Sequence, residues 1–198
     1  GIIMANADPQ SFSVIVDNYG AKNEIVYTKD ATHVFYNNYK ENLMSPSIIP
    51  GADPTTFVLL HNDTHASGYS KDAHAVYWGD VIVSGANPST FQNLDPYGKD
   101  NGSAYFNATR IIGADPNTFV VLDVWVLLNS GYAKDARAVY FNGEQIPGAD
   151  PATFEVASGS DGTSYSPYWP SDSSNWPSSN SIDAKDKNHG YSQGEIVY

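Results

Sequence analysis

Tyrosine, lysine and aspartate recur together along the sequence, and these residue types could form an acid–base set. An active site is normally singular, whereas this group occurs five times. The repetition indicates a structural role, in which the aromatic residues pack in a core and Lys and Asp form a turn and an ion pair. We therefore expect no enzyme and no catalytic residue. In each copy an aromatic residue follows the Asp by five positions: Lys29-Asp30 with Phe35, Lys71-Asp72 with Tyr77, Lys99-Asp100 with Tyr105, Lys134-Asp135 with Tyr140, and Lys185-Asp186 with Tyr191.

Two further groups have residue types that bind cations. His61, Asp63 and His65 alternate, so in an extended strand two imidazoles and a carboxylate would point the same way, as a zinc-like ion requires. The stretch from Asp95 to Gly102 has some likeness to a calcium loop, but it lacks the alternating acidic spacing and the distal Glu. The other repeats lack the histidine group. We interpret His61 and His65 as incidental loop residues, and we expect neither a metal nor a cofactor.

Charge and composition exclude several classes of partner. Ten Lys and Arg face 22 Asp and Glu, which gives a net charge of −12 and repels phosphate backbones and anionic lipid head groups. We expect no nucleic acid and, without a run of 18 apolar residues, no membrane insertion. There is no Cys, so disulfides cannot indicate the compartment. An acidic chain with few Lys and much Asn, Ser, Thr and Tyr is typical of bacterial extracellular or cell-surface proteins, which is the location we predict.

A second recurring motif is expected to hold the Lys-Asp motif in place. Ala-Asp/Asn-Pro-x-Ser/Thr-Phe occurs five times and ends at Phe12, Phe57, Phe91, Phe119 and Phe154. The Asp is predicted to cap a helical turn or a type I turn that begins at the Pro, after which the Phe enters the core. We predict that the five phenylalanines are buried in equivalent environments, together with Tyr77, Tyr105 and Tyr140.

The segments between the motifs indicate short strands. In residues 138–146, β-branched and aromatic residues flank Asn142-Gly143, which is the strongest short signal for a hairpin with a type I′ turn. Three or four such strands per unit predict an all-β fold of tandem hairpin or meander repeats stacked as a solenoid-like array. A five-bladed, propeller-like ring is the alternative.

The spacing defines one repeat domain, residues 1–198, of about five units. Three copies keep ten residues between the aromatic and the next Asp or Asn, whereas residues 37–48 and 158–181 are insertions. The second insertion, with two Tyr and two Trp among Ser and Pro, is either an irregular loop, a linker, a glycosylated strip or a surface for a sugar or protein. Because the chain opens on one motif and closes on the other, we expect half a unit at each end.

The two motifs in fixed order resemble the repeat of the bacterial DKNYY family, and Asp186-Lys187-Asn188 matches the start of that name. The likeness covers nearly the whole chain. It departs from the pattern at Asn87, which replaces Asp, at Gly190, which replaces Val or Ala, and at Asp183, which replaces the Tyr found two residues before the other lysines. The resemblance implies a repeat protein and no particular reaction.

The expected half units suggest a function. A solenoid cut in this way leaves unpaired strand edges, and such edges recruit strands from another molecule. We therefore expect an extracellular structural protein that assembles head to tail with itself, as a fibre or a surface layer. Its interface would bury the apolar ends Ile2, Ile3, Met4, Ile196, Val197 and Tyr198. Two alternatives remain open: a monomeric adhesin or module that binds carbohydrate or protein, glycans included, and a hydrolase with paired carboxylates.

Overall fold

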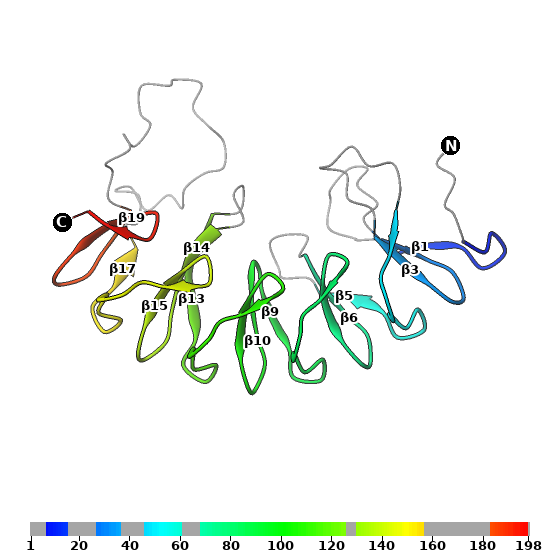
Figure 1. The fold of residues 1–198 in the computed structure, drawn as a ribbon, viewed down its shortest axis with the longest axis horizontal. Coiled ribbons are helices and arrows are strands. Elements are labelled where there is room, and N and C mark those ends of the chain that lie inside the picture. Colours follow the sequence, from blue (N-terminus) through cyan, green and yellow to red (C-terminus); the bar gives the residue numbers. More distant parts are fainter. Residues whose placement is uncertain are drawn as a thin grey trace, which may run out of the picture. The chain divides into compact units, whose positions relative to one another are not determined.

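The computed structural model describes residues 7–15, 27–36, 46–60, 68–125, 130–156 and 183–197 (Figure 1). These residues form five four-stranded antiparallel sheets in tandem, which confirms the predicted all-β repeat fold, and the described part of the chain contains no helix. None of the sheets closes into a barrel. The chain divides into two compact units, residues Gly1–Arg110 and Ile111–Tyr198, which we describe separately.

The first unit contains three sheets, which we call repeats 1 to 3. Repeat 1 consists of β1 (Ser13–Ile15), β2 (Tyr27–Lys29), β3 (Val34–Tyr36) and β4 (Ser47–Ile48). Repeat 2 consists of β5 (Val58–Leu59), β6 (Tyr69–Lys71), β7 (Val76–Trp78) and β8 (Val81–Ile82). Repeat 3 consists of β9 (Gln92–Leu94), β10 (Tyr97–Lys99), β11 (Ala104–Phe106) and β12 (Thr109–Arg110).

The second unit contains the remaining two sheets, repeats 4 and 5. Repeat 4 consists of β13 (Val120–Trp125), β14 (Ser130–Lys134), β15 (Val139–Phe141) and β16 (Glu144–Gln145). Repeat 5 consists of β17 (Glu155–Val156), β18 (Ala184–Lys185), β19 (Gly190–Ser192) and β20 (Glu195–Ile196).

Every sheet is a meander in which each strand pairs with the next strand in the sequence. The Lys-Asp turn joins the second strand to the third, and the Ala-Asp-Pro turn precedes the first strand, so both motifs lie at one end of the sheet. We call this the Asp end. The links between strands one and two, and between strands three and four, lie at the opposite end, which we call the connection end.

The predicted half units at the two ends are wrong. β1 to β4 and β17 to β20 each form a full four-stranded sheet, so the described residues form five whole repeats. The reason is that the two motifs belong to one sheet: the Ala-Asp-Pro turn opens each repeat and the Lys-Asp turn stands in its middle. The predicted insertion 37–48 is also too long, because Ser47 and Ile48 form β4 and pair with Tyr36 and Phe35. Residues 37–45 lie outside the described residues, as does the whole of the second predicted insertion, 158–181.

Two kinds of tight turn give the repeats their outline. The predicted Asn-Gly hairpin is confirmed: Asn142 and Gly143 have φ angles of 52° and 81° and join β15 to β16, as a type I′ turn requires. A second turn links consecutive repeats. Pro50-Gly51 and Pro147-Gly148 occupy its centre, with Gly at φ 75° and 84°, and the following Ala N–H bonds back to Ile49 or Ile146. Pro followed by a left-handed Gly is the composition of a type II turn.

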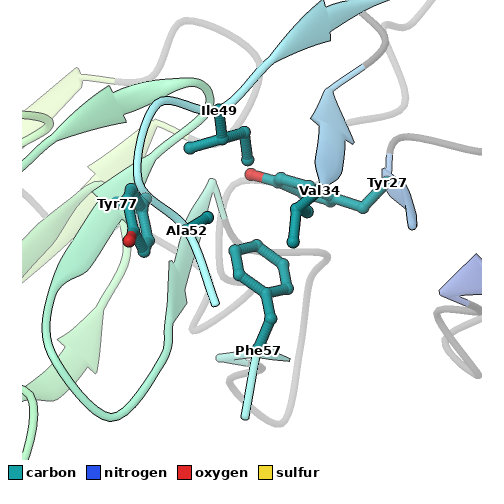
Figure 2. Packing of buried hydrophobic residues seen from close by; sticks show 6 residues of the cluster. All are labelled: Tyr27, Val34, Ile49, Ala52, Phe57 and Tyr77. Carbon is teal, nitrogen blue, oxygen red and sulfur yellow. The ribbon is translucent and has the colours of Figure 1, made fainter. Parts of the chain in front are cut away.

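The motif phenylalanines form the joints between repeats. In Figure 2, Phe57 of repeat 2 lies between Tyr27 of repeat 1 and Tyr77 of its own repeat, beside Ala52. Its ring centroid is 5.5 Å from that of Tyr27 and 5.8 Å from that of Tyr77. Such tilted aromatic pairs stabilise a core beyond the area that they bury. The same sandwich recurs inside the first unit at Phe91, between Tyr69 and Tyr105, and inside the second unit at Phe154, between Tyr132 and Tyr191.

Four of the five motif phenylalanines, and all three tyrosines predicted to be buried with them, are buried. They are Phe57, Phe91, Phe119, Phe154, Tyr77, Tyr105 and Tyr140. Phe12 departs from the prediction of equivalent burial, because 38% of it is exposed. The sandwich explains the difference. One half of each joint comes from the preceding repeat, and the described residues before Phe12 are only the turn that begins at Ala7.

Candidate functional site

The recurring Lys-Asp aspartate is the centre of the Asp end of each sheet. In repeat 2, Asp72 is buried, and its Oδ1 accepts hydrogen bonds from the backbone N–H groups of His74 and Ala75 at 2.7 and 2.8 Å. Its Oδ2 accepts the backbone N–H of Asp53 and the hydroxyl of Tyr77, both at 2.8 Å. One carboxylate therefore holds its own turn, the Ala-Asp-Pro turn and the aromatic of the motif. We call this arrangement the carboxylate knot.

The same knot recurs in repeats 3, 4 and 5. Asp100, Asp135 and Asp186 each accept four hydrogen bonds from the corresponding groups, at 2.7 to 3.1 Å. Repeat 1 has Phe35 in place of the tyrosine, and the Thr32 hydroxyl donates to Asp30 at 3.0 Å. Both oxygens of each carboxylate are thus engaged in holding backbone. The arrangement favours a structural role over acid–base chemistry.

The pKa of each knot carboxylate reflects two opposing effects, burial and hydrogen bonding. Burial alone would raise the pKa of Asp72, but the N–H groups of Asp53 and His74 and the Tyr77 hydroxyl outweigh burial, so the pKa lies below its usual value. Asp100 and Asp135 follow the same pattern. Burial, together with the bond to Asp72, raises the pKa of Tyr77 far above its usual range. The aspartates are therefore ionised and the tyrosines neutral at pH 7.

The aspartate of the Ala-Asp-Pro motif is a cap, as predicted. Asp53 Oδ1 accepts the backbone N–H of Thr55, and its Oδ2 accepts the Thr56 hydroxyl at 2.8 Å. The hydrogen bonds from Thr55 and Thr56 lower the pKa of Asp53 to about 2. In repeat 3, Asn87 caps the backbone N–H of Ser89 in the same way. The structure forms a turn without a helix, with the Phe57 N–H bonded to the Asp53 carbonyl.

The Ser or Thr of this motif has a role that the sequence did not reveal. The Thr56 hydroxyl accepts the backbone N–H of Ala73 at 3.1 Å, so it connects the Ala-Asp-Pro turn to the Lys-Asp turn. The equivalent bonds are Ser11 to Ala31, Thr118 to Ala136 and Thr153 to Lys187. The signal was present in the sequence, because a hydroxyl residue stands at this place in all five copies.

The motif lysines connect one repeat to the next. The ion pair expected between Lys71 and Asp72 is replaced by a 2.8 Å hydrogen bond from Lys71 Nζ to the carbonyl of Pro88, at the start of repeat 3. Lys29 binds Pro54 and Lys134 binds Pro151 in the same way. The cause is geometric, since a lysine at the end of a strand and the Asp after it point in different directions.

A tyrosine two residues before each of these lysines also crosses to the next repeat. The hydroxyl of Tyr27 donates to the carbonyl of Gly79, and that of Tyr69 donates to the carbonyl of Asn107 at 2.7 Å. In the second unit, the Tyr132 hydroxyl donates to Asp183 and accepts the backbone N–H of Gly194. Each described joint therefore combines an aromatic sandwich with hydrogen bonds from a tyrosine and a lysine.

The connection end differs from the Asp end. Repeat 3 links its first two strands through Asp95 and Pro96 alone, with a cis peptide bond between them. The same link spans eleven residues in repeat 1, nine in repeat 2 and 27 in repeat 5 (16–26, 60–68 and 157–183). The link between strands three and four varies as well, with ten residues in repeat 1 (37–46) and two in each of the others. Variation in length is thus confined to the connection end, whereas the Lys-Asp turn has four residues in every repeat.

The remaining candidates do not form a site in the described residues. His61, Asp63 and His65 lie outside them. Asp100, part of the faint calcium pattern, is a knot carboxylate, and the described residues contain no group of three His, Cys, Asp or Glu arranged to hold a metal. Ile196 and Val197 are 44% exposed, whereas Ile2, Ile3, Met4 and Tyr198 lie outside the described residues. The described part also contains no helix that could cross a membrane.

These features define an all-β tandem-repeat protein in which two motifs build each sheet and each described joint. The model of the DKNYY family matches residues 1–81 and residues 27–195. The chain belongs to the DKNYY family. No curated protein and no solved structure matches it.

Proposed function

We propose that this chain is a non-enzymatic, extracellular repeat scaffold that binds a glycan or protein partner through the connection ends of its sheets. The observation that carries the proposal is the contrast between the two ends of each repeat. The Asp end has turns of constant length, closed by a buried carboxylate. The connection end has a first link that ranges from two residues in repeat 3 to 27 in repeat 5. In repeat proteins, insertions of unequal length commonly occupy the face that binds the partner.

The carboxylate knots support the non-enzymatic part of this proposal. A general acid or base needs a proton that it can exchange near neutral pH. The knot aspartates have lowered pKa values, and their oxygens already accept four hydrogen bonds each from the protein in repeats 2 to 5. The acidic composition, the basis on which we expected a location outside the cell, also fits a surface that repels nucleic acid and anionic lipid.

Head-to-tail assembly was expected because a half repeat at each end would pair with the half repeat of another molecule. The described residues form five whole sheets, so they contain no such half repeat. The alternative of a binding module, raised by the sequence, does not depend on that premise. We therefore propose the binding role ahead of self-assembly.

A loop-trimmed variant tests the binding role. Residues 16–26 and 157–182 are replaced by the Asp-Pro link of repeat 3, and binding is measured on a glycan array and on intact bacterial cell walls. We expect the trimmed protein to keep the circular dichroism spectrum of the wild type and to lose its binding. A control variant, Asn117→Ala, changes an exposed side chain at an Asp end and should bind as the wild type does. Equal binding by the trimmed protein, or loss of binding in the control, would contradict the proposal.

A further inference from the structure

Each repeat that is followed by another repeat carries a pair of aromatic residues on neighbouring strands. The pairs are Tyr27 with Tyr36, Tyr69 with Trp78, Tyr97 with Phe106, and Tyr132 with Phe141. Their ring centroids are 4.6 to 5.2 Å apart. In the joints described above, the first ring of the pair contacts the phenylalanine of the next repeat. Within each unit, the pair is therefore the platform on which the next repeat rests.

Repeat 5 has polar residues at both positions of this platform. Asp183 stands two residues before Lys185, where the other repeats have Tyr, and Ser192 follows Tyr191, where they have an aromatic residue. The Asp183 carboxylate is already engaged. Its Oδ1 accepts the hydroxyl of Tyr132 from repeat 4 at 2.6 Å, and its Oδ2 accepts the backbone N–H of Gln193 at 2.8 Å. The residue completes the joint with repeat 4 and offers no ring to a further repeat.

The lysine of repeat 5 keeps its residue type and lies beside a neighbouring strand. Lys29, Lys71 and Lys134 donate to a Pro carbonyl of the following repeat. Lys185 instead lies 3.9 Å from Glu155 on the neighbouring strand of its own sheet, and two thirds of its side chain is exposed. The two aromatic groups that a repeat normally presents to its successor are thus both replaced by polar residues in repeat 5.

We propose that repeat 5 is a capping repeat, which closes the joint with repeat 4 and does not accept a further repeat on its opposite face. Burying Asp183 and Ser192 under an apolar phenylalanine would remove them from water without a new partner, which is unfavourable. Stacked repeats need terminal units with a polar outer face to stay soluble, and the two polar replacements supply such a face. This inference does not depend on the proposed binding role.

The first repeat presents the complementary half of a joint. Phe12, 38% exposed, is the residue that would receive an aromatic platform, and Phe57, Phe91 and Phe154 show the contacts that it would then make. The capping proposal therefore makes a definite statement about self-association. Copies of the wild type should not stack end to end, because the platform is missing from repeat 5, whereas a copy with a restored platform should engage Phe12 of another.

The experiment restores the platform with Asp183→Tyr and Ser192→Phe together, and measures association by sedimentation equilibrium. We expect a monomeric wild type and an end-to-end association constant at least about tenfold higher in the double variant, a change of about 1.4 kcal/mol. Adding Phe12→Ser to the double variant should return it to the monomer. If the circular dichroism spectrum shows that the double variant does not fold, Ser192→Phe alone is tested in its place. This single variant keeps the hydrogen bonds of Asp183.

The wild type and the double variant decide the question together. Wild-type protein that polymerises, and whose polymerisation is abolished by Phe12→Ser, would overturn the proposal, since the platform would then be unnecessary. A folded double variant that stays monomeric would overturn it too. A monomeric wild type with a platform variant that associates through Phe12 would establish the cap.

Discussion

The hydroxyl of Tyr140 donates a 2.9 Å hydrogen bond to Oδ2 of Asp135, five residues earlier, and both residues are buried. The five-residue spacing between the Asp and the aromatic of the first motif places the two groups within reach of this bond in repeats 2 to 5. The same oxygen accepts the backbone N–H of Asp115 at 2.7 Å, so the bond also connects the two motifs of the repeat.

Replacement of the knot aspartate should destabilise the fold far more than replacement of the capping aspartate. Asp135→Asn puts an amide group where Oδ2 or Oδ1 accepts N–H donors, so it leaves at least one buried donor unpaired, at a cost of roughly 2–3 kcal/mol. Asp115→Asn is the matched control, because Asn87 already performs the capping role in repeat 3. Urea unfolding measures both variants. Equal losses would show that the knot has no special place in the fold.

Removal of a buried motif phenylalanine should produce the largest loss. Phe119→Ala deletes a buried ring that packs against Tyr140 at 5.8 Å, which should cost roughly 3–5 kcal/mol. The half-exposed Phe12 is the control, and Phe12→Ala should cost less than half as much. The midpoints of thermal unfolding, with circular dichroism as the probe, allow the comparison. A Phe12 variant as unstable as the Phe119 variant would contradict the sandwich model of the joints.

Acid should unfold the protein through the knots. The folded pKa values of Asp72, Asp100 and Asp135 lie below that of an unfolded Asp, about 3.9, so the unfolded chain binds more protons as the pH falls. The free energy of unfolding should stay level from pH 7 to about 5 and fall steeply below about 4. Asp135→Asn should show a shallower fall, by about one proton. A wild-type curve that stays flat to pH 2 would refute the assignment.

A methyl group at Gly98 should disturb repeat 3. A Cβ atom there would lie 2.3 Å from Cζ of Phe91, whose ring is held between Tyr69 and Tyr105. Gly98→Ala should therefore cost roughly 1–3 kcal/mol, as overpacking typically does. Gly102→Ala is the matched control, because its Cβ would have ordinary contact, 3.6 Å, with Asp100 Oδ1. Hydrogen exchange of the repeat 3 amides would locate the loss, and an unaffected repeat 3 would disprove the close contact.

The sequence predicted the fold class and the number of copies, and four of the five motif phenylalanines that it placed in the core are buried, because recurring motifs and alternating apolar residues report directly on local structure. The boundaries of the repeat could not be obtained in the same way. Two motifs that alternate along a chain can be grouped in either order, and only the pairing of β1 with β2 and of β17 with β18 shows which grouping forms a sheet.

The contacts of the charged groups also required the structure. Lys71 and Asp72 are adjacent in the sequence, which suggested a pair, yet the lysine binds Pro88 of the next repeat and the aspartate binds Asp53 of its own. These partners are 17 and 19 residues away. The spacing of the motif predicted that Tyr77 is buried in the core. It did not predict that the Tyr77 hydroxyl donates a hydrogen bond to the Asp72 carboxylate.

The meander topology has a consequence for how the chain folds. Every strand pairs with its neighbour in the sequence, so no sheet must wait for a distant segment, and the loop-closure entropy of each pairing is small. All-β proteins are usually slow folders because their contacts are far apart along the chain. In this protein repeat 2 can pair its strands as soon as Ile82 has left the ribosome, and each joint then forms when the next phenylalanine emerges. Synthesis and folding can therefore advance together, one repeat at a time, from the N-terminus.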